Sequence, residues 1–191
     1  HYFIKNNGDV INLVPDAYEA WHAGKSNWKK YTSLNKYSLG IEINNPGHKY
    51  RYKNFNLKQI KSLTRLLKNL ISFYNINPKN ILGHSDIAPN RKKDPGEKFP
   101  WRILAKKHLC EWHHLNQKKI EVYRNMRISF KEETQFLNNL YKIGYCKVKG
   151  IKLSKNKIFI IKAFQRRFRQ DLVNGKIDKE CFYISKNLLK T

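Results

Sequence analysis

The sequence lacks several features that would each point to a particular class of protein. Its 191 residues include only three cysteines, which are widely spaced, at positions 110, 146 and 181. They form neither a disulfide framework nor a Cys-x-x-Cys metal site, so we expect buried free thiols. No apolar run approaches the roughly 18 residues that a membrane-spanning helix needs, and we expect no such helix.

Acidic residues are also scarce, with 14 Asp and Glu against 39 Lys and Arg, for a formal net charge of +25. Such a charge can attract nucleic acid or an anionic surface such as a cell envelope. The lysines are spread over the whole chain among Asn and Ile, and no helix-turn-helix, zinc-finger or RNA-binding signature is present. We therefore expect no nucleic-acid partner.

The first part of the chain alternates strand and helix patterns. An Asn-Gly turn between apolar runs predicts a β-hairpin, and alternating apolar residues predict a further strand. Apolar residues at helical spacing predict an amphipathic helix that begins after Asn56. The expected strands cover residues 2–4, 10–14, 38–43 and 81–82, and the expected helices cover 56–74 and 101–112. This mixture predicts an α/β domain, a mixed central sheet flanked by helices, over residues 1–115.

The rest of the chain reads as a second, helical domain. Residues 116–130 are polar and lack strong periodicity, which predicts a linker. Helical patterns follow at residues 132–140, 158–168 and 180–189. Three short helices predict a small bundle with its own core over residues 131–191.

The most informative stretch runs from residue 83 to residue 96 and contains His84, Lys92 and Asp94. Pro89 and Pro95 each restrict their own φ and the residue before them, so we expect a stiff loop without helix. A histidine nitrogen and an aspartate oxygen are ligands typical of catalytic zinc, which takes three protein ligands and keeps a fourth position for water. The alternative is a hydrogen-bonded surface pair.

Glu42 lies in the strand predicted at residues 38–43, on the face opposite to Leu39, Ile41 and Ile43. A carboxylate on the open face of a central strand is unusual for a structural residue, which makes Glu42 a candidate catalytic group. The alternative is a solvated strand carboxylate.

Together these segments resemble the zinc-dependent N-acetylmuramoyl-L-alanine amidases of the type 2 amidase superfamily. The likeness is greatest to the two-domain periplasmic amidases of Gram-negative bacteria. It is carried by residues 1–4 (HYFI), 20–24 (AWHAG), 38–42 (SLGIE), 83–96 (GHSDIAPNRKKDPG) and 163–169 (AFQRRFR). The resemblance implies a type 2 amidase-like catalytic domain followed by a three-helix peptidoglycan-binding domain.

The same resemblance assigns roles to single residues. His84 and Asp94 match two of the family's three zinc ligands. Glu42 matches the residue that positions or deprotonates the attacking water, and Lys92 the residue that stabilises the oxyanion. Trp21 and His22 match positions that line the substrate cleft. The bond attacked would be the amide between N-acetylmuramic acid and the L-alanine of the peptidoglycan stem peptide.

One ligand of the family pattern has no match. The family's first zinc ligand is a histidine on an N-terminal strand upstream of the position that His1 matches. Since the sequence opens on His1 rather than Met, we expect an N-terminally truncated amidase. Loss of a central strand would expose apolar surface and an unpaired strand edge. The amine and imidazole of His1 are a less favoured substitute for the missing ligand.

Two hypotheses follow from this departure. In the first, the protein is a zinc amidase of the periplasm or cell envelope of a Gram-negative bacterium, with outer-membrane anchoring through the missing N-terminal segment. In the second, it is a catalytically inactive, truncated remnant that binds peptidoglycan. Intact Glu42, Lys92, His84 and Asp94 favour the first hypothesis.

Overall fold

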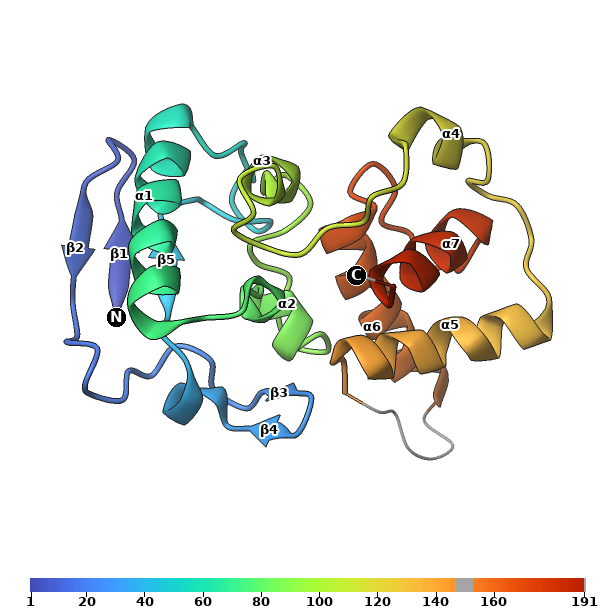
Figure 1. The fold of residues 1–191 in the computed structure, drawn as a ribbon, viewed down its shortest axis with the longest axis horizontal. Helices are drawn as coiled ribbons and strands as arrows, with labels where there is room; N and C mark the ends of the chain where they lie inside the picture. The colour runs from blue at the N-terminus through green and yellow to red at the C-terminus, as the bar shows by residue number, and fades with distance from the viewer. Residues whose placement is uncertain (147–152, 191) are drawn as a thin grey trace.

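Two parts of different architecture lie side by side along the longest axis of the molecule (Figure 1). The structure is a computed structural model that describes residues 1–146 and 153–190. The first part contains β1 (Tyr2–Ile4), β2 (Val10–Asn12), β3 (Asn27–Trp28), β4 (Tyr31–Thr32), β5 (Ile41–Ile43), α1 (Leu57–Tyr74), α2 (His84–Ile87) and α3 (Trp101–Ala105). The second contains α4 (Gln117–Glu121), α5 (Phe130–Ile143), α6 (Leu153–Phe168) and α7 (Lys179–Leu188). The predicted mixed α/β fold class is confirmed.

The larger sheet has the order β2-β1-β5, with β1 antiparallel to β2 and parallel to β5. Phe3 pairs with Ile11 on one side and with Glu42 on the other. A separate two-stranded sheet pairs β3 with β4. In the described part of the chain, no strand pairs with the second edge of β5.

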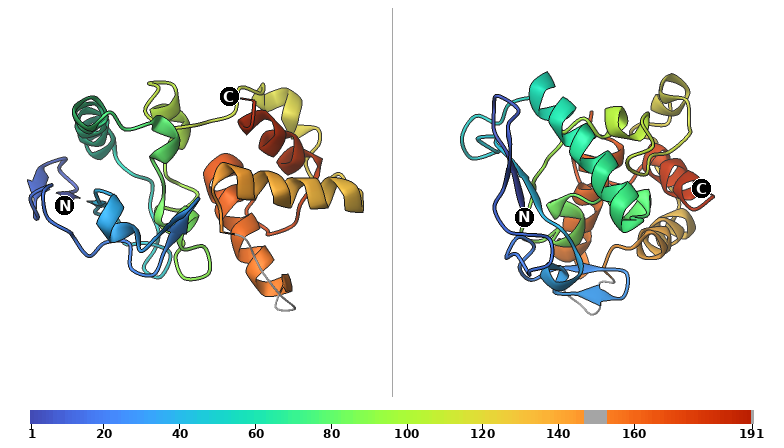
Figure 2. Two further views of the ribbon diagram at one scale, coloured as in Figure 1. Left: turned by 60° about the horizontal axis from the view of Figure 1, so that its bottom comes forward. Right: turned by 60° about the vertical axis from the view of Figure 1, so that its left-hand side comes forward.

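Helix α1 packs against the sheet, and its start is specified locally (Figures 1 and 2). Asn56 and Gln59 form a capping box, which satisfies backbone N–H groups at the helix N-terminus. The Gln59 amide also donates to the backbone oxygen of Asn44, at 2.7 Å, and so ties the helix to the end of β5. The helix ends at Asn75, which adopts a left-handed conformation. Within the described ranges, no helix combines the length and apolar character that crossing a bilayer requires.

The loop predicted to be free of helix contains one helical turn, α2, at His84–Ile87, so this prediction is wrong. Pro89 restricts its own φ and the backbone conformation of Ala88, whose φ is −140°. Both residues lie after the helical turn, so the proline does not prevent it. At the start of the turn, the Asp86 carboxylate accepts from the backbone N–H of Gly83, at 2.8 Å. The contact from Asp86 to Gly83 stabilises this helical turn, and the positions of the prolines are compatible with it.

Three other predicted segments differ from the structure. Ile81 and Leu82 belong to no strand, and the predicted helix at residues 101–112 ends at Ala105 as α3. His108 then takes a positive φ of 57°, which a continuing α-helix does not allow. The predicted linker contains helix α4, whose Ile120 is buried. The domain boundaries at residues 115 and 131 stay a prediction.

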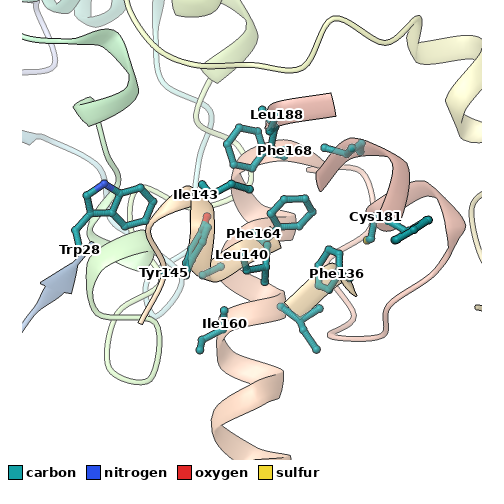
Figure 3. Close-up of a cluster of buried hydrophobic side chains, with 14 of the residues drawn as sticks. Trp28, Phe136, Leu140, Ile143, Tyr145, Ile160, Phe164, Phe168, Cys181 and Leu188 are labelled. Carbon is teal, nitrogen blue, oxygen red and sulfur yellow. The ribbon is translucent and has the colours of Figure 1, made fainter. Parts of the chain in front are cut away.

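One of the two buried apolar clusters includes residues of both parts. Figure 3 shows Trp28 of β3 beside side chains of the helical part, and Trp28 belongs to the same buried cluster as Phe136 and Phe164. The Trp28 and Tyr145 rings meet edge to face at 5.1 Å. A Cβ at Gly144 would lie 2.5 Å from the Trp28 ring, so only glycine permits this approach. The core of the helices therefore extends to Trp28 of the first part, while the division into two domains stays a prediction.

Candidate active site

All six side chains singled out from the sequence line one cavity of about 1200 Å³. Trp21 and His22 come from the loop before β3, Glu42 from β5, and His84, Lys92 and Asp94 from the segment that starts with α2. The structure thus brings together residues that lie up to 73 positions apart in the sequence, from Trp21 to Asp94. Their roles stay predictions, but their convergence is a structural fact.

His84 and Asp94 form the chemical centre of this cavity. The Nδ1 atom of His84 lies 3.0 Å from Oδ2 of Asp94, and its Nε2 atom lies 3.1 Å from the backbone oxygen of Ala23. A carbonyl oxygen only accepts, so Nε2 carries the proton. In the imidazolium form Nδ1 also carries a proton and donates to Asp94, whereas in the neutral ring Nδ1 is a lone pair that faces a carboxylate oxygen. Two such atoms repel each other unless a proton or a metal cation lies between them.

The Asp94 carboxylate is open to solvent, with 57% of its side chain exposed, whereas the His84 side chain is 15% exposed. Although the side chain is more than half exposed, desolvation by the surrounding protein is still the largest influence on Asp94 and raises its pKa. The hydrogen bond with His84 and the charges of His84 and Lys92 together bring the pKa below its ordinary value. The backbone N–H of Ser85 donates to the backbone oxygen of Asp94, at 2.8 Å. This bond holds the two ends of the loop together.

The side chain of Asn35 helps to hold the loop that carries Trp21 and His22. The Asn35 side-chain oxygen accepts from the backbone N–H groups of His22, Ala23 and Gly24, at 3.2, 2.7 and 3.3 Å. The backbone oxygen of Ala23, in the same loop, contacts Nε2 of His84, so the loop orients the imidazole ring. A backbone contact to the second nitrogen of a metal-binding histidine is the usual way in which proteins fix its tautomer.

His22 lies directly against the segment that leads into β5. A Cβ on Gly40 would sit 2.3 Å from the His22 ring, so glycine is required at that position. Burial lowers the pKa of His22, against the opposite effect of its hydrogen bond to the backbone oxygen of Ser38, and favours a neutral imidazole. Trp21 is 93% exposed at the edge of the cavity and contributes little to the core.

Glu42 and Lys92 approach the cavity from different elements. Glu42 lies on the exposed face of β5, as the alternation in the sequence predicts. Lys92 follows a turn in which its backbone N–H donates to the oxygen of Ala88, at 2.9 Å, and its side chain is half-buried. A carboxylate and an ammonium group therefore line the same cavity as the His84–Asp94 pair.

No third ligand joins His84 and Asp94: among the described residues, no group of three or more His, Cys, Asp or Glu is arranged to hold a metal ion. The His1 ring accepts from the backbone N–H of Gly40 at Nδ1, at 3.0 Å, and lies 3.0 Å from the oxygen of Tyr18 at Nε2. Both ring nitrogens are engaged, and the terminal amine donates to the Gly40 oxygen. These bonds argue against metal chelation by His1.

Sequence reasoning missed a group of residues beneath the site. Asp86 is 1% exposed and accepts from Tyr145 and Arg167, both of the helical part. Asp86 stood within the recognised loop, but nothing in the sequence pairs it with groups 59 and 81 residues away. Only long-range packing brings these three side chains together.

The comparisons with known proteins agree with one another. The family model described as N-acetylmuramoyl-L-alanine amidase matches residues 1–97. N-acetylmuramoyl-L-alanine amidase AmiD of Escherichia coli K12 is 37% identical over 187 residues, which are 95% of this chain and 67% of AmiD. The 1,6-anhydro-N-acetylmuramyl-L-alanine amidase AmpD of the same organism is 37% identical over 110 residues, 56% of this chain and 58% of AmpD.

A solved structure is similar over the full chain. It is the complex of E. coli AmiD with the substrate anhydro-N-acetylmuramic acid-L-Ala-D-gamma-Glu-L-Lys, with a TM-score of 0.87 and 36% identity. The match covers 100% of this chain and 78% of that one. The chain thus spans about two thirds of the length of full AmiD and a little over half of AmpD.

Proposed function

The chain belongs to the N-acetylmuramoyl-L-alanine amidase family, and from this premise we propose that it hydrolyses the amide between N-acetylmuramic acid and L-alanine with zinc as its cofactor. The family and the enzyme class that the sequence predicted are confirmed. AmpD is named for anhydromuramyl substrates, and AmiD was solved with an anhydromuramyl peptide. We extend this substrate class, muramyl peptides of peptidoglycan, to the present chain.

The observation that carries the zinc proposal is the contact between His84 and Asp94. Two ligand atoms on a tetrahedral zinc lie roughly 3.4 Å apart, since each bond is about 2.0–2.2 Å long. The observed distance of 3.0 Å between Nδ1 and Oδ2 is within a few tenths of an ångström of that spacing. The Nε2 proton directed at Ala23 leaves Nδ1 free to bind. His84 and Asp94 would therefore hold the metal.

When bound there, zinc would supply Lewis acidity, which brings the pKa of water towards about 7 and polarises a carbonyl. Glu42 has the chemistry to take the proton of the attacking water and to pass it to the leaving amine. Lys92 has the charge to stabilise negative charge that develops on the carbonyl oxygen. Trp21 and His22 would contact the sugar or the peptide in the cleft.

The third ligand stays a prediction from the family resemblance, which expects a histidine on a further strand. Two observations support it. The second edge of β5 has no partner strand in the described part of the chain. The cavity beside it is lined by half-buried apolar side chains, among them Ile41, Ile43 and Phe55. A strand at this edge would cover them.

The helical part would bind peptidoglycan, as its resemblance to a three-helix peptidoglycan-binding domain suggests. A net charge of +25 favours contact with anionic envelope polymers. A wall-bound enzyme fits a periplasmic or envelope location in a Gram-negative bacterium, where an anchor in the outer membrane would keep it near its substrate. An inactive wall-binding remnant is the less favoured alternative.

The test combines zinc binding with product analysis. The chain is stripped of metal, loaded with one equivalent of zinc and incubated with intact and anhydro muramyl tripeptides, and the products are identified by mass spectrometry. We expect a released peptide with a free L-alanine amine, and no release by the stripped chain or by His84→Ala. Cleavage that is indifferent to chelator, or cleavage of another bond, would contradict the proposal.

Binding to purified sacculi separates the two hypotheses. A chain that sediments with sacculi but neither binds zinc nor cleaves muramyl peptides would be the inactive remnant. A chain that cleaves only with zinc is the amidase, whatever its affinity for sacculi.

A further inference from the structure

A buried carboxylate connects the proposed metal site with the helical part of the chain. Asp86 lies two residues after His84 and is 1% exposed. Its Oδ1 accepts from the hydroxyl of Tyr145, at 2.7 Å. Its Oδ2 accepts from the backbone N–H of Gly83, at 2.8 Å, and from the guanidinium of Arg167, at 2.9 Å. Three donors, two of them from the helical part, thus surround this one side chain.

Arg167 contacts the segment that carries the site at two points. One terminal nitrogen donates to Asp86, and the other donates to the backbone oxygen of Ile81, at 2.8 Å. Its guanidinium lies 4.2 Å from the centre of the Trp101 ring, and its side chain is 3% exposed. The planar fork of arginine suits two acceptors at once, which a lysine ammonium does not reproduce.

The contact reaches both proposed ligands through short backbone links. Asp86 holds the N–H of Gly83, the residue directly before His84. Ser85, directly after His84, donates to the backbone oxygen of Asp94. A Cβ on Gly83 would lie 2.7 Å from the ring of Pro95, so the two ends of the loop are in close contact. A shift of Asp86 would therefore move His84 relative to Asp94.

Stability by itself is a weak reason for such a group. A buried ion pair loses much of its attraction to the cost of desolvation, and well-packed apolar residues often replace it without loss. The Asp86–Arg167 pair instead fixes the position of the loop that carries His84 and Asp94. Since Arg167 comes from α6, this geometry depends on the docking of the helical part.

We propose that Arg167 and Tyr145 are positioning residues of the metal site, which act through Asp86 to hold His84 and Asp94 at ligand distance. The helical part is then a structural component of the catalytic centre and not only an attached binding module. This inference rests on the proposed zinc function. Outer contacts of this kind commonly change metal affinity by about 10–100-fold when they are removed.

The same helix region offers a matched control. Arg169 is also fully buried, and it pairs with Asp178, at 2.9 Å, and with Glu180. These partners belong to the helical part and do not touch the loop at residues 83–96. Arg169→Lys therefore perturbs a buried arginine pair of the same kind without a link to the site.

The experiment compares Arg167→Lys, Tyr145→Phe and Arg169→Lys with the unmodified full chain. The zinc dissociation constant is measured by competition with a chromophoric chelator, and thermal melts record stability. We expect Arg167→Lys to weaken zinc binding about 10–100-fold and Tyr145→Phe to weaken it less. Tyr145→Phe keeps the ring beside Trp28, so it tests the hydroxyl even if Arg167→Lys fails to fold. Arg169→Lys should stay within about twofold of the unmodified chain, even where its melting temperature falls.

Amide hydrogen exchange of the metal-free chain gives an independent readout. The N–H groups of Ser85 and Asp86 are bonded to Asp94 and Gly83, so they should exchange about tenfold faster in Arg167→Lys and Tyr145→Phe, but not in Arg169→Lys. Unchanged exchange and unchanged zinc affinity in both variants would overturn the positioning role, as would equal effects in the control. If the unmodified chain binds no zinc, the proposed function fails, and exchange at the loop alone decides this inference.

Discussion

The two parts of the chain are packed to different degrees. In the helical part, Phe136, Leu140 and Phe164 are fully buried and meet across α5 and α6. In the first part, Ile41 and Ile43 of β5 are only half-buried and border the large cavity. The candidate site therefore lies in the loosely packed first part, whereas the side chains that hold its loop in place, Tyr145 and Arg167, come from the tightly packed helical part.

Asp94→Ala should separate function from stability most clearly. The carboxylate is one of two proposed ligands, so zinc-dependent turnover should fall to background. Because its side chain is 57% exposed, the free energy of unfolding should change by less than about 0.5 kcal/mol. Zinc content, product release and urea unfolding are measured together, with the exposed neighbour Lys93→Ala as control. Retained zinc-dependent activity would remove Asp94 from the metal site.

Glu42→Gln tests whether the carboxylate on the exposed face of β5 takes part in proton transfer. The amide keeps the size of the side chain but cannot accept a proton, so we expect the rate to fall about 10²–10⁴-fold. Zinc content should be unchanged, because Glu42 is not a proposed ligand. Glu19→Gln, at another exposed position, serves as control. A near-normal rate would exclude Glu42 from the proton transfer.

Phe136→Ala tests the tightly packed part. This side chain is fully buried and meets Phe164 edge to face at 5.2 Å, so its loss should reduce stability by about 3–5 kcal/mol. The same truncation at Phe73, which is 80% exposed on α1, should cost less than about 0.5 kcal/mol. Urea unfolding measures both. Equal losses of stability in the two variants would mean that the difference in packing does not affect the free energy of unfolding.

His113, near the junction of the two parts, should make stability depend on pH. It is 4% exposed, and burial, with a smaller contribution from the charge of Arg102, lowers its pKa to about 4. The unfolded chain, with a histidine pKa of about 6.5, binds the proton more tightly, so stability is complete above pH 6.5 and is lost as the pH falls towards 4.

For this one group the loss between pH 7.5 and pH 5 is about 2 kcal/mol. His113→Gln, which does not titrate, should show a correspondingly shallower dependence in urea unfolding at the two pH values. Parallel curves for the two proteins would contradict the assignment.

Trp21→Ala should have the smallest effect. The side chain is 93% exposed, so stability should not change measurably. Loss of an aromatic contact with sugar or peptide should raise KM about fivefold, equivalent to about 1 kcal/mol, and leave kcat nearly unchanged. Tyr18→Ala, also exposed, is the control. A lower kcat with unchanged KM would mean that Trp21 does not act by binding substrate.

Much of the fold could be predicted from local signals. Helix α1 begins after Asn56 as predicted, because its cap and its apolar spacing lie within one short segment. Helix α7, at Lys179–Leu188, is likewise within two residues of its prediction. The helical turn α2 was not predicted, since it depends on the contact from the Asp86 side chain to Gly83 and not on the spacing of the prolines.

The sequence by itself determined the family, the positions of helices α1 and α7 and the choice of six candidate site residues, because these follow from short-range spacing and from a loop of characteristic residues. Only the tertiary structure decided that the two parts share a core and that Arg167 and Tyr145 hold Asp86 beneath the candidate site. Those contacts join residues far apart in the chain, and their partners are selected by burial and geometry. A single sequence contains no local signal for such a choice.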